Sequence, residues 1–134
     1  MHINSHEYKL DKETIIVSET DAKGRIVYAN EDFCRISKYS KDELIGHPHN
    51  MVRHPDMPKA AFEDLWQTVK SGKVWKGIVK NRTKDDGFYW VNATVYPSTT
   101  SQGDIRYFSV RVRPTPDEVE KAEALYETLQ STGA

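Results

Sequence analysis

Alternation of apolar and polar residues predicts β-strands in two separate parts of the chain. Residues 13–20 (ETIIVSET) contain a β-branched run, and residues 25–29 (RIVYA) follow after a short turn that contains Asp and Gly. Three further segments alternate with a period of two: residues 74–83, 88–96 and 105–112. Asp86 and Gly87 stand between the first two of these and form a strong hairpin signal. The pattern therefore predicts an N-terminal hairpin and a C-terminal unit of three antiparallel strands.

Capping signals predict short helices between the two groups of strands. Asn30 stands directly before EDFCRIS, where a helix N-cap belongs, and Ser40 and Glu43 form the S-x-x-E capping box. Residues 47–57 contain two prolines and three histidines, which excludes one long helix there. Pro58 begins a better helix, which Gly72 ends. Its apolar face consists of Phe62, Leu65, Trp66 and Val69.

The last segment, residues 116–130 (PDEVEKAEALYETLQ), reads as a charged amphipathic helix. Its narrow apolar stripe consists of Val119, Ala122, Leu125 and Leu129. The whole order of elements predicts an α+β fold in which helices cover one face of a five-stranded antiparallel sheet, with a ligand cavity between them. We expect residues 1–12 to form an N-terminal cap or loose segment, residues 13–114 the domain, and residues 115–134 an exit helix or linker.

Composition and charge narrow the class of protein. The chain has 134 residues, of which 37% are hydrophobic and 29% charged, with a net charge of −1 at pH 7. This balance gives no electrostatic reason to expect nucleic acid or an anionic membrane as the main partner. The longest aliphatic run, residues 15–17, is far shorter than the roughly 20 residues of a membrane span. The single cysteine, Cys34, excludes an internal disulfide framework. We therefore expect a cytoplasmic type of domain, or a soluble piece of a larger protein.

The predicted strand at residues 74–83 carries the first candidate chemistry. Its alternation puts Trp75, Gly77, Val79 and Asn81 on one face of the sheet. Gly77 permits close approach of a ligand, and the Asn81 amide can both donate and accept hydrogen bonds. This set suits a flat heteroaromatic ring such as a flavin, whose edge alternates C=O and N–H groups. The alternative is a core strand in which the Asn81 amide bonds to backbone.

A second candidate group lies in the proline-rich segment: His49, Arg53, His54 and Asp56. Without cysteine, and with this much proline, the histidines are a weak metal signal. Arg53 and His54 are better interpreted as partners of an anionic or polar part of a cofactor. Asp56 can orient either of them, or can cap the helix that follows. Nothing in the sequence combines a nucleophile, a base and an orienting group, so we do not expect an enzyme.

Two motifs resemble a known family. NxxFxxxSxYxxxELIG at residues 30–46 is the helical signature of PAS domains. GxPHNMVRHPDMPKAAF at residues 46–62 is much narrower, and with WxGIVKNR at residues 75–82 it resembles the PAS domains of bacterial aerotaxis receptors of the Aer type. The similarity extends over about residues 14–130.

The resemblance implies a PAS fold and a sensory FAD cofactor, held without a covalent bond, that reports cellular redox state. It also implies that a membrane anchor, a HAMP segment and a chemoreceptor signalling region follow in the whole receptor. Among the site residues, the asparagine matching Asn30 is important for flavin binding in Aer-like domains, and the one matching Asn81 contacts flavin in the light-sensing LOV domains. As a helix cap, however, Asn30 needs no ligand.

Departures from LOV domains limit what the resemblance implies. The reactive cysteine of LOV domains falls at His49, and their strand glutamine falls at Val112, so we do not expect light-driven adduct formation. Two alternatives stay open: a haem-binding gas sensor with His49 or His54 as axial ligand, and an unliganded PAS module that mediates homodimerisation. The residues alone do not distinguish FAD from FMN; only the resemblance selects FAD.

Overall fold

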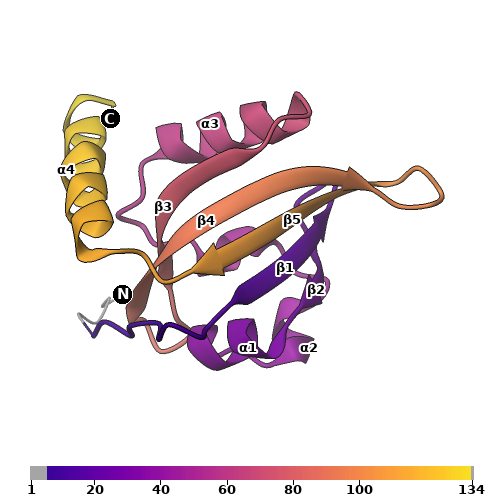
Figure 1. Ribbon diagram of the computed structural model, residues 1–134, viewed down its shortest axis with the longest axis horizontal. Helices are drawn as coiled ribbons and strands as arrows, with labels where there is room; N and C mark the ends of the chain where they lie inside the picture. The colour runs from indigo at the N-terminus through magenta and orange to yellow at the C-terminus, as the bar shows by residue number, and fades with distance from the viewer. Residues whose placement is uncertain (1–5, 134) are drawn as a thin grey trace.

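The computed structural model describes residues 6–133; residues 1–5 of the predicted N-terminal segment lie outside the described part, as does residue 134. Its centre is a five-stranded antiparallel sheet with the order β2-β1-β5-β4-β3 (Figure 1). The strands are β1 (Ile16–Asp21), β2 (Ile26–Ala29), β3 (Trp75–Arg82), β4 (Phe88–Thr99) and β5 (Ile105–Val112). Each strand lies within or near its predicted range, but β4 extends three residues beyond Tyr96 because Pro97 to Thr99 still pair with β5.

The helices follow the predicted capping signals. They are α1 (Glu31–Ser37), α2 (Lys41–Leu44), the 3₁₀ helix η1 (His49–Val52), α3 (Lys59–Lys70) and α4 (Pro116–Gly133). The Asn30 side chain accepts a hydrogen bond from the Phe33 N–H and so caps α1. Both bonds of the Ser40–Glu43 capping box are present at α2. The sequence-based assignment of these two helix starts is therefore confirmed.

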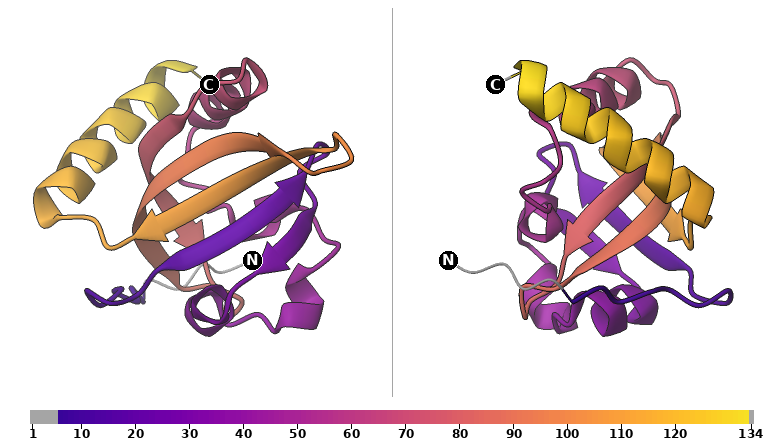
Figure 2. Two further views of the ribbon diagram at one scale, coloured as in Figure 1. Left: turned by 45° about the vertical axis from the view of Figure 1, so that its right-hand side comes forward. Right: turned by 90° about the vertical axis from the view of Figure 1, so that its left-hand side faces the viewer.

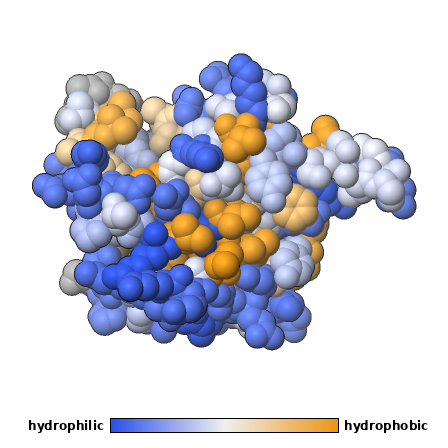
Figure 3. Space-filling model, viewed as in Figure 1, coloured by the Kyte–Doolittle hydropathy of each residue, from blue (hydrophilic) through white to orange (hydrophobic). Residues whose placement is uncertain are grey.

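The two faces of the sheet are covered differently. Helices α1, α2, η1 and α3 cover the inner face, whereas α4 crosses the outer face beside β3 and β4 (Figures 1 and 2). The buried core lies under the first group of helices, and its largest apolar members include Phe33, Leu44, Val69, Tyr89 and Val91. Nothing within residues 6–133 covers the rest of the outer face. Hydrophobic side chains gather in its middle (Figure 3), where β1 and β5 pair Val17 with Val110.

Helix α4 docks with most of the apolar stripe that the sequence predicted. Ala122 is buried, and Val119 and Leu129 are half-buried. Leu125, the fourth member of the stripe, is 54% exposed, and the Tyr126 hydroxyl beside it donates a hydrogen bond to the Ile78 carbonyl of β3. The prediction failed at Leu125 because a tyrosine, which carries a polar group to satisfy, makes the contact with the strand.

The N-terminal residues that are described lie against the domain. Glu7 pairs with Phe88 as an isolated β-bridge, and Leu10 is buried in the core. Within residues 6–133, no helix combines the length and the apolar character that crossing a bilayer requires.

Candidate functional site

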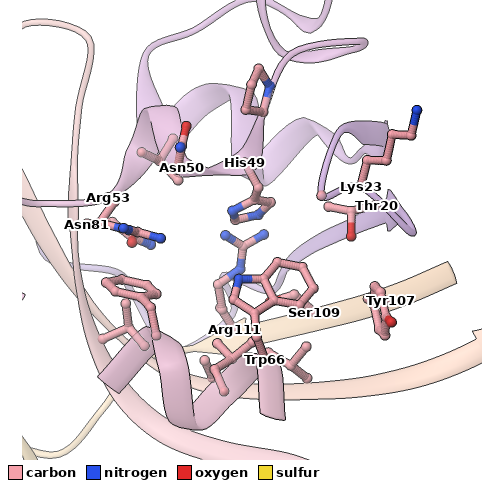
Figure 4. A pocket seen from close by; sticks show the side chains of 18 of the residues that line it. Thr20, Lys23, His49, Asn50, Arg53, Trp66, Asn81, Tyr107, Ser109 and Arg111 are labelled. Carbon is pink, nitrogen blue, oxygen red and sulfur yellow. The ribbon is translucent and has the colours of Figure 1, made fainter. Parts of the chain in front are cut away.

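A cavity of about 560 Å³ lies between the inner face of the sheet and the helices η1 and α3. Strands β3, β4 and β5 form its floor, and the β1–β2 turn forms one end. Much of its lining is apolar, with Val52, Phe62, Leu65, Trp66, Val79 and Val95 among the contributors. This volume falls in the usual range for small-molecule sites, and the polar groups that converge on it decide what it can bind (Figure 4).

Asn81 faces this cavity, as the alternation along β3 predicts. Its side chain lines the cavity and is 4% exposed. Its backbone forms an isolated antiparallel bridge with Arg53, so the segment after η1 runs along the free edge of β3. The bridge brings two of the predicted site residues together, and their side chains lie side by side in Figure 4.

Arg53 presents its guanidinium to the cavity from the side of η1. The guanidinium carbon lies 3.8 Å from the centre of the Phe62 ring, and Nε is buried with no hydrogen-bond partner among residues 6–133. Burial lowers the pKa of this arginine, but an arginine side chain keeps its proton in proteins at physiological pH. Arg53 therefore contributes a positive charge and an unused N–H donor.

Arg111, on β5, is a site residue that the sequence analysis did not select. It is 2% exposed, and its guanidinium carbon lies 4.4 Å from the centre of the Phe33 ring. Nη2 donates to Ser18 Oγ at 2.6 Å, whereas Nε and Nη1 are buried and have no hydrogen-bond partner in the described part of the chain. No carboxylate within the described residues forms an ion pair with it. Burial lowers the pKa of Arg111 to about 10, which leaves it charged at neutral pH.

The distribution of side chains on β5 explains why the sequence analysis missed Arg111. Tyr107, Ser109 and Arg111 line the cavity, whereas Val112 is 38% exposed on the other face. The sequence analysis placed the LOV glutamine at Val112, and that position does not face the cavity. A strand whose inward residues are polar while its outward residues are apolar indicates a ligand site rather than a core, and this reversed alternation could have identified Arg111.

His49 is held next to Arg111 by a shared hydroxyl. Its Nε2 lies 3.1 Å from Ser18 Oγ, and its ring stacks on Phe33 at 5.7 Å. Since arginine can only donate, Ser18 Oγ accepts from Arg111 and has its own hydrogen free for His49 Nε2. Burial, reinforced by the charge of Arg111, lowers the pKa of His49 to about 3. His49 is therefore neutral at physiological pH.

Three predicted site residues lie outside the cavity lining and have structural partners. Asn30 Oδ1 accepts hydrogen bonds from the N–H groups of Val17 and Phe33, and Nδ2 donates to the Ile15 carbonyl. His54 is buried at 3% exposure, where Nδ1 accepts from the Asp56 N–H. Asp56 in turn forms an ion pair of 2.8 Å with Lys80. Asn30 acts as the helix cap that the sequence offered as one alternative.

Trp75 and Gly77 also lie outside the cavity lining. The Trp75 indole N–H donates to Asp64 of α3 at 2.8 Å. A Cβ added at Gly77 would lie 2.4 Å from the Trp75 ring, so the missing side chain makes room for this tryptophan. The close approach expected at Gly77 exists, but the aromatic group that uses it belongs to the protein.

The site as a whole can receive a planar ring that accepts hydrogen bonds at its edges. Apolar walls from α3 and the sheet fit the faces of such a ring, and Asn81, Arg53 and Arg111 supply donors around it. No group of three or more metal-ligating side chains occurs in the described part of the chain.

Comparison with known proteins agrees with this architecture. Residues 26–112 match the PAS fold family. The chain belongs to the PAS fold family. Over 96% of its length it is 44% identical to the aerotaxis receptor of Escherichia coli K12, of which it covers 27%. It is 28% identical to the nitrogen fixation regulatory protein of Klebsiella oxytoca, with 74% of this chain and 20% of that protein covered. The chain thus spans about a quarter or less of these relatives.

Solved structures agree on the fold. The dark-state structure of the blue-light photoreceptor Aureochrome1 LOV superposes with a TM-score of 0.68 at 21% identity, covering 89% of this chain and 86% of that one. Its light-state structure gives a TM-score of 0.67 at 20% identity, covering 90% and 92%. The predicted fold class and the predicted PAS membership are therefore confirmed.

Proposed function

We propose that this chain is a sensory PAS domain that binds FAD without a covalent bond and reports redox state. The observation that carries the proposal is the pair of cavity arginines, Arg53 and Arg111, with three buried donor nitrogens that have no partner among the described residues. A buried donor without a partner costs about 1–3 kcal/mol. A ligand with acceptor atoms at its ring edge would satisfy these donors, and a flavin ring carries such atoms.

The cavity residues would divide the work of binding. Val79, Val95 and the aromatic residues of α3 would contact the faces of the ring, while Asn81, Arg53 and Arg111 would bond to its edges. A bound flavin supplies electron transfer. The positive charge of Arg111 would favour any state of the ring with more negative charge. His49 and Ser18 would hold the Arg111 guanidinium in place.

The other predicted site residues would act through this group rather than by contact. His54 and Asp56 follow Arg53 directly, and their mutual hydrogen bond together with the Asp56–Lys80 ion pair fixes this segment on the edge of β3. Asn30, Trp75 and Gly77 would fix α1 and the start of β3. Loss of any of these would lower flavin occupancy by loosening the cavity walls.

The link to a larger receptor is also part of the proposal. The 44% identity to a protein named aerotaxis receptor supports a role in energy sensing, with a HAMP and chemoreceptor signalling region as the downstream partner. A change at Asn81 would pass through its backbone bridge to Arg53 and along the segment that follows Arg53. The ion pair between Asp56 of this segment and Lys80 would then carry it to the outer face of the sheet. Helix α4 lies on that face and leads out of the domain.

The test is the spectrum of the purified chain. We expect flavin bands at about 450 nm, and release of FAD on heating, because the proposed binding is non-covalent. Arg53→Ala should lose flavin while keeping a folded circular dichroism signal, and Arg113→Ala, an exposed arginine just after β5, serves as the matched control. A Soret band at about 400–420 nm would replace this proposal with the haem alternative. A colourless protein that does not take up added FAD would reject both.

A further inference from the structure

The charged residues of the cavity all have the same sign. Its lining includes Lys23, Arg53, Lys70 and Arg111, and no aspartate or glutamate among the residues that the structure describes. The chain as a whole has 20 acidic and 19 basic residues, so this selection does not reflect its composition. A cavity with four cations and no carboxylate is suited to a ligand that carries negative charge.

The four cations lie at two depths. Arg53 and Arg111 are at the inner end, where Asn81 is 4% exposed and Arg111 2% exposed. Lys23 and Lys70 are exposed lining residues, the first on the β1–β2 turn and the second at the end of α3. In Figure 4, Lys23 and Thr20 lie at the opposite end of the group from Arg53 and Asn81. The cavity is therefore elongated, with positive charge at its inner end and at its mouth.

Trp66 connects the two lysines at the mouth. A Cβ placed on Gly24, the residue after Lys23, would lie 3.5 Å from the Trp66 ring. Lys70 Nζ lies 5.7 Å from the centre of the same ring. The indole thus contacts the turn next to Lys23 as well as the Lys70 ammonium, and it packs edge-on against Tyr107 at 5.3 Å. A half-buried aromatic side chain with these contacts holds the turn that carries Lys23 close to the end of α3 that carries Lys70.

Neither lysine is neutralised by the protein. None of the ion pairs within residues 6–133 involves Lys23 or Lys70. The nearest acid in sequence to Lys23 is Asp21, whose carboxylate already accepts from the N–H groups of Lys23 and Arg25 and from the Arg25 side chain. Both ammonium groups are therefore available to bind a ligand that extends from the cavity through its mouth.

We propose that Lys23 and Lys70 form a phosphate subsite at the mouth of the cavity, which holds the phosphate groups of a flavin nucleotide whose ring occupies the inner end. This inference rests on the proposed function. It explains how a chain without a glycine-rich phosphate loop can prefer a nucleotide to the bare ring. Both FMN and FAD carry phosphate groups, and their binding affinities distinguish the two.

The experiment compares riboflavin, FMN and FAD as ligands of the apo protein, by quenching of flavin fluorescence. We expect wild type to bind FMN and FAD more tightly than riboflavin. The double variant Lys23→Ala/Lys70→Ala should lose about tenfold in affinity for the phosphorylated ligands, since each contact is solvent-exposed. Its affinity for riboflavin should stay unchanged. Lys23→Arg/Lys70→Arg should restore the preference, and Lys12→Ala/Lys59→Ala, which removes two exposed lysines elsewhere, should have no effect.

Salt provides a second measurement on the same proteins. Raising the ionic strength from 0.05 M to 0.5 M should weaken FMN and FAD binding to wild type, but leave the Lys23→Ala/Lys70→Ala variant and all riboflavin binding almost unchanged. The ratio of the FAD and FMN affinities in wild type then measures how much the adenosine monophosphate part of FAD adds to binding.

The outcomes separate the two proposals. If none of the three flavins binds, the proposed function fails. If riboflavin binds as tightly as FAD, or if the lysine variant binds all three ligands like wild type, only the phosphate subsite is overturned. Equal losses for riboflavin and FAD in the variant would likewise overturn it, because the lysines would then support the fold rather than the phosphates.

Discussion

Two hollows on opposite faces of the same sheet differ in how the protein pairs the cationic side chain inside them. In the inner cavity, Arg111 donates to one hydroxyl, and its Nε and Nη1 have no hydrogen-bond partner among the described residues. In the outer hollow, about 500 Å³ in volume between α4 and strands β3 and β4, Lys80 is paired with Asp56 at 2.8 Å. Lys80 Nζ also lies 4.5 Å from the centre of the Phe88 ring. A cationic side chain whose charge and donors are paired within the protein indicates a structural role. One whose donors are left without partners indicates a ligand-binding site.

The difference extends to the surrounding charges. The outer hollow includes the acidic residues Asp56, Glu123 and Glu127, of which Asp56 forms an ion pair with Lys80. The inner cavity has no such acids among its described lining residues. If this comparison is sound, removing the cation should have opposite consequences in the two places, and the following predictions begin with the largest effect.

Arg111→Met should separate binding from stability. Affinity for flavin should fall about 10- to 150-fold, because a charge-assisted hydrogen bond contributes about 1.5–3 kcal/mol. The free energy of unfolding of the apo protein should rise, since two buried donors without partners disappear and methionine keeps most of the volume. Flavin titration and urea denaturation of the apo protein measure the two quantities. An apo protein that loses stability would show that Arg111 is a structural residue like Lys80.

His49→Gln should change the pH dependence of folding. The pKa of His49 is lowered to about 3 in the folded protein, against an ordinary value of 6.5. Between these values the unfolded chain binds a proton that the folded chain does not, so stability falls as the pH falls from 6.5 towards 3. The slope approaches about 1.4 kcal/mol per pH unit from this single group. Glutamine can still accept from Ser18 but does not titrate.

The measurement is urea denaturation of apo wild type and apo His49→Gln at several pH values between 4 and 7. The variant should lose part of the acid sensitivity, and His47→Gln, an exposed histidine two residues away, should retain it. Parallel pH profiles for wild type and His49→Gln would contradict the prediction, because they would place the acid sensitivity in other groups.

Lys80→Met should lower the free energy of unfolding by about 1 kcal/mol and weaken flavin binding far less than Arg111→Met does, because it only loosens the segment that follows Arg53. The hydrogen bond from Lys80 lowers the pKa of Asp56, so the pair stabilises the fold above the ordinary pKa of an aspartate. As the pH falls through the lowered pKa, that contribution is lost. The stability difference between wild type and variant should therefore shrink below pH 4. A loss of flavin affinity as large as that of Arg111→Met would show that Lys80 belongs to the site rather than to the fold.

The sequence predicted those features of the fold and the site that depend on neighbouring residues. Local signals identified the caps at Asn30 and Ser40 because each depends on a few neighbouring residues. Alternation along β3 identified Asn81 because its inward neighbour Val79 is apolar. On β5 the apolar residues Phe108 and Val110 lie outside, so hydrophobicity pointed to the wrong face.

The remaining site residues depended on contacts between distant segments. The partners of Arg111 are Ser18 on β1 and Phe33 on α1, and neither lies close to it in the sequence. The room at Gly77 suits a ligand or an indole equally well, and only the folded chain shows that Trp75 fills it. Sequence patterns thus located the strand that carries the site, but not which of its charged residues lack partners.

Tyr126→Phe should give the smallest effect and tests whether the outer hollow is independent of the cavity. The Tyr126 hydroxyl bonds to the backbone carbonyl of Ile78, three residues before Asn81 on the edge strand β3. Its loss should cost about 0.5 kcal/mol, at the low end for a hydrogen bond that water can replace. Amide hydrogen exchange should then accelerate in α4 and around Ile78 of β3, but not in η1. The affinity for flavin should match that of wild type. Tyr28→Phe, which alters an exposed tyrosine on β2, is the matched control. If the change at Tyr126 instead altered exchange in η1 or the affinity for flavin, the two hollows would be energetically coupled. Position 126 would then belong to the path by which the cavity communicates with the helix that leaves the domain.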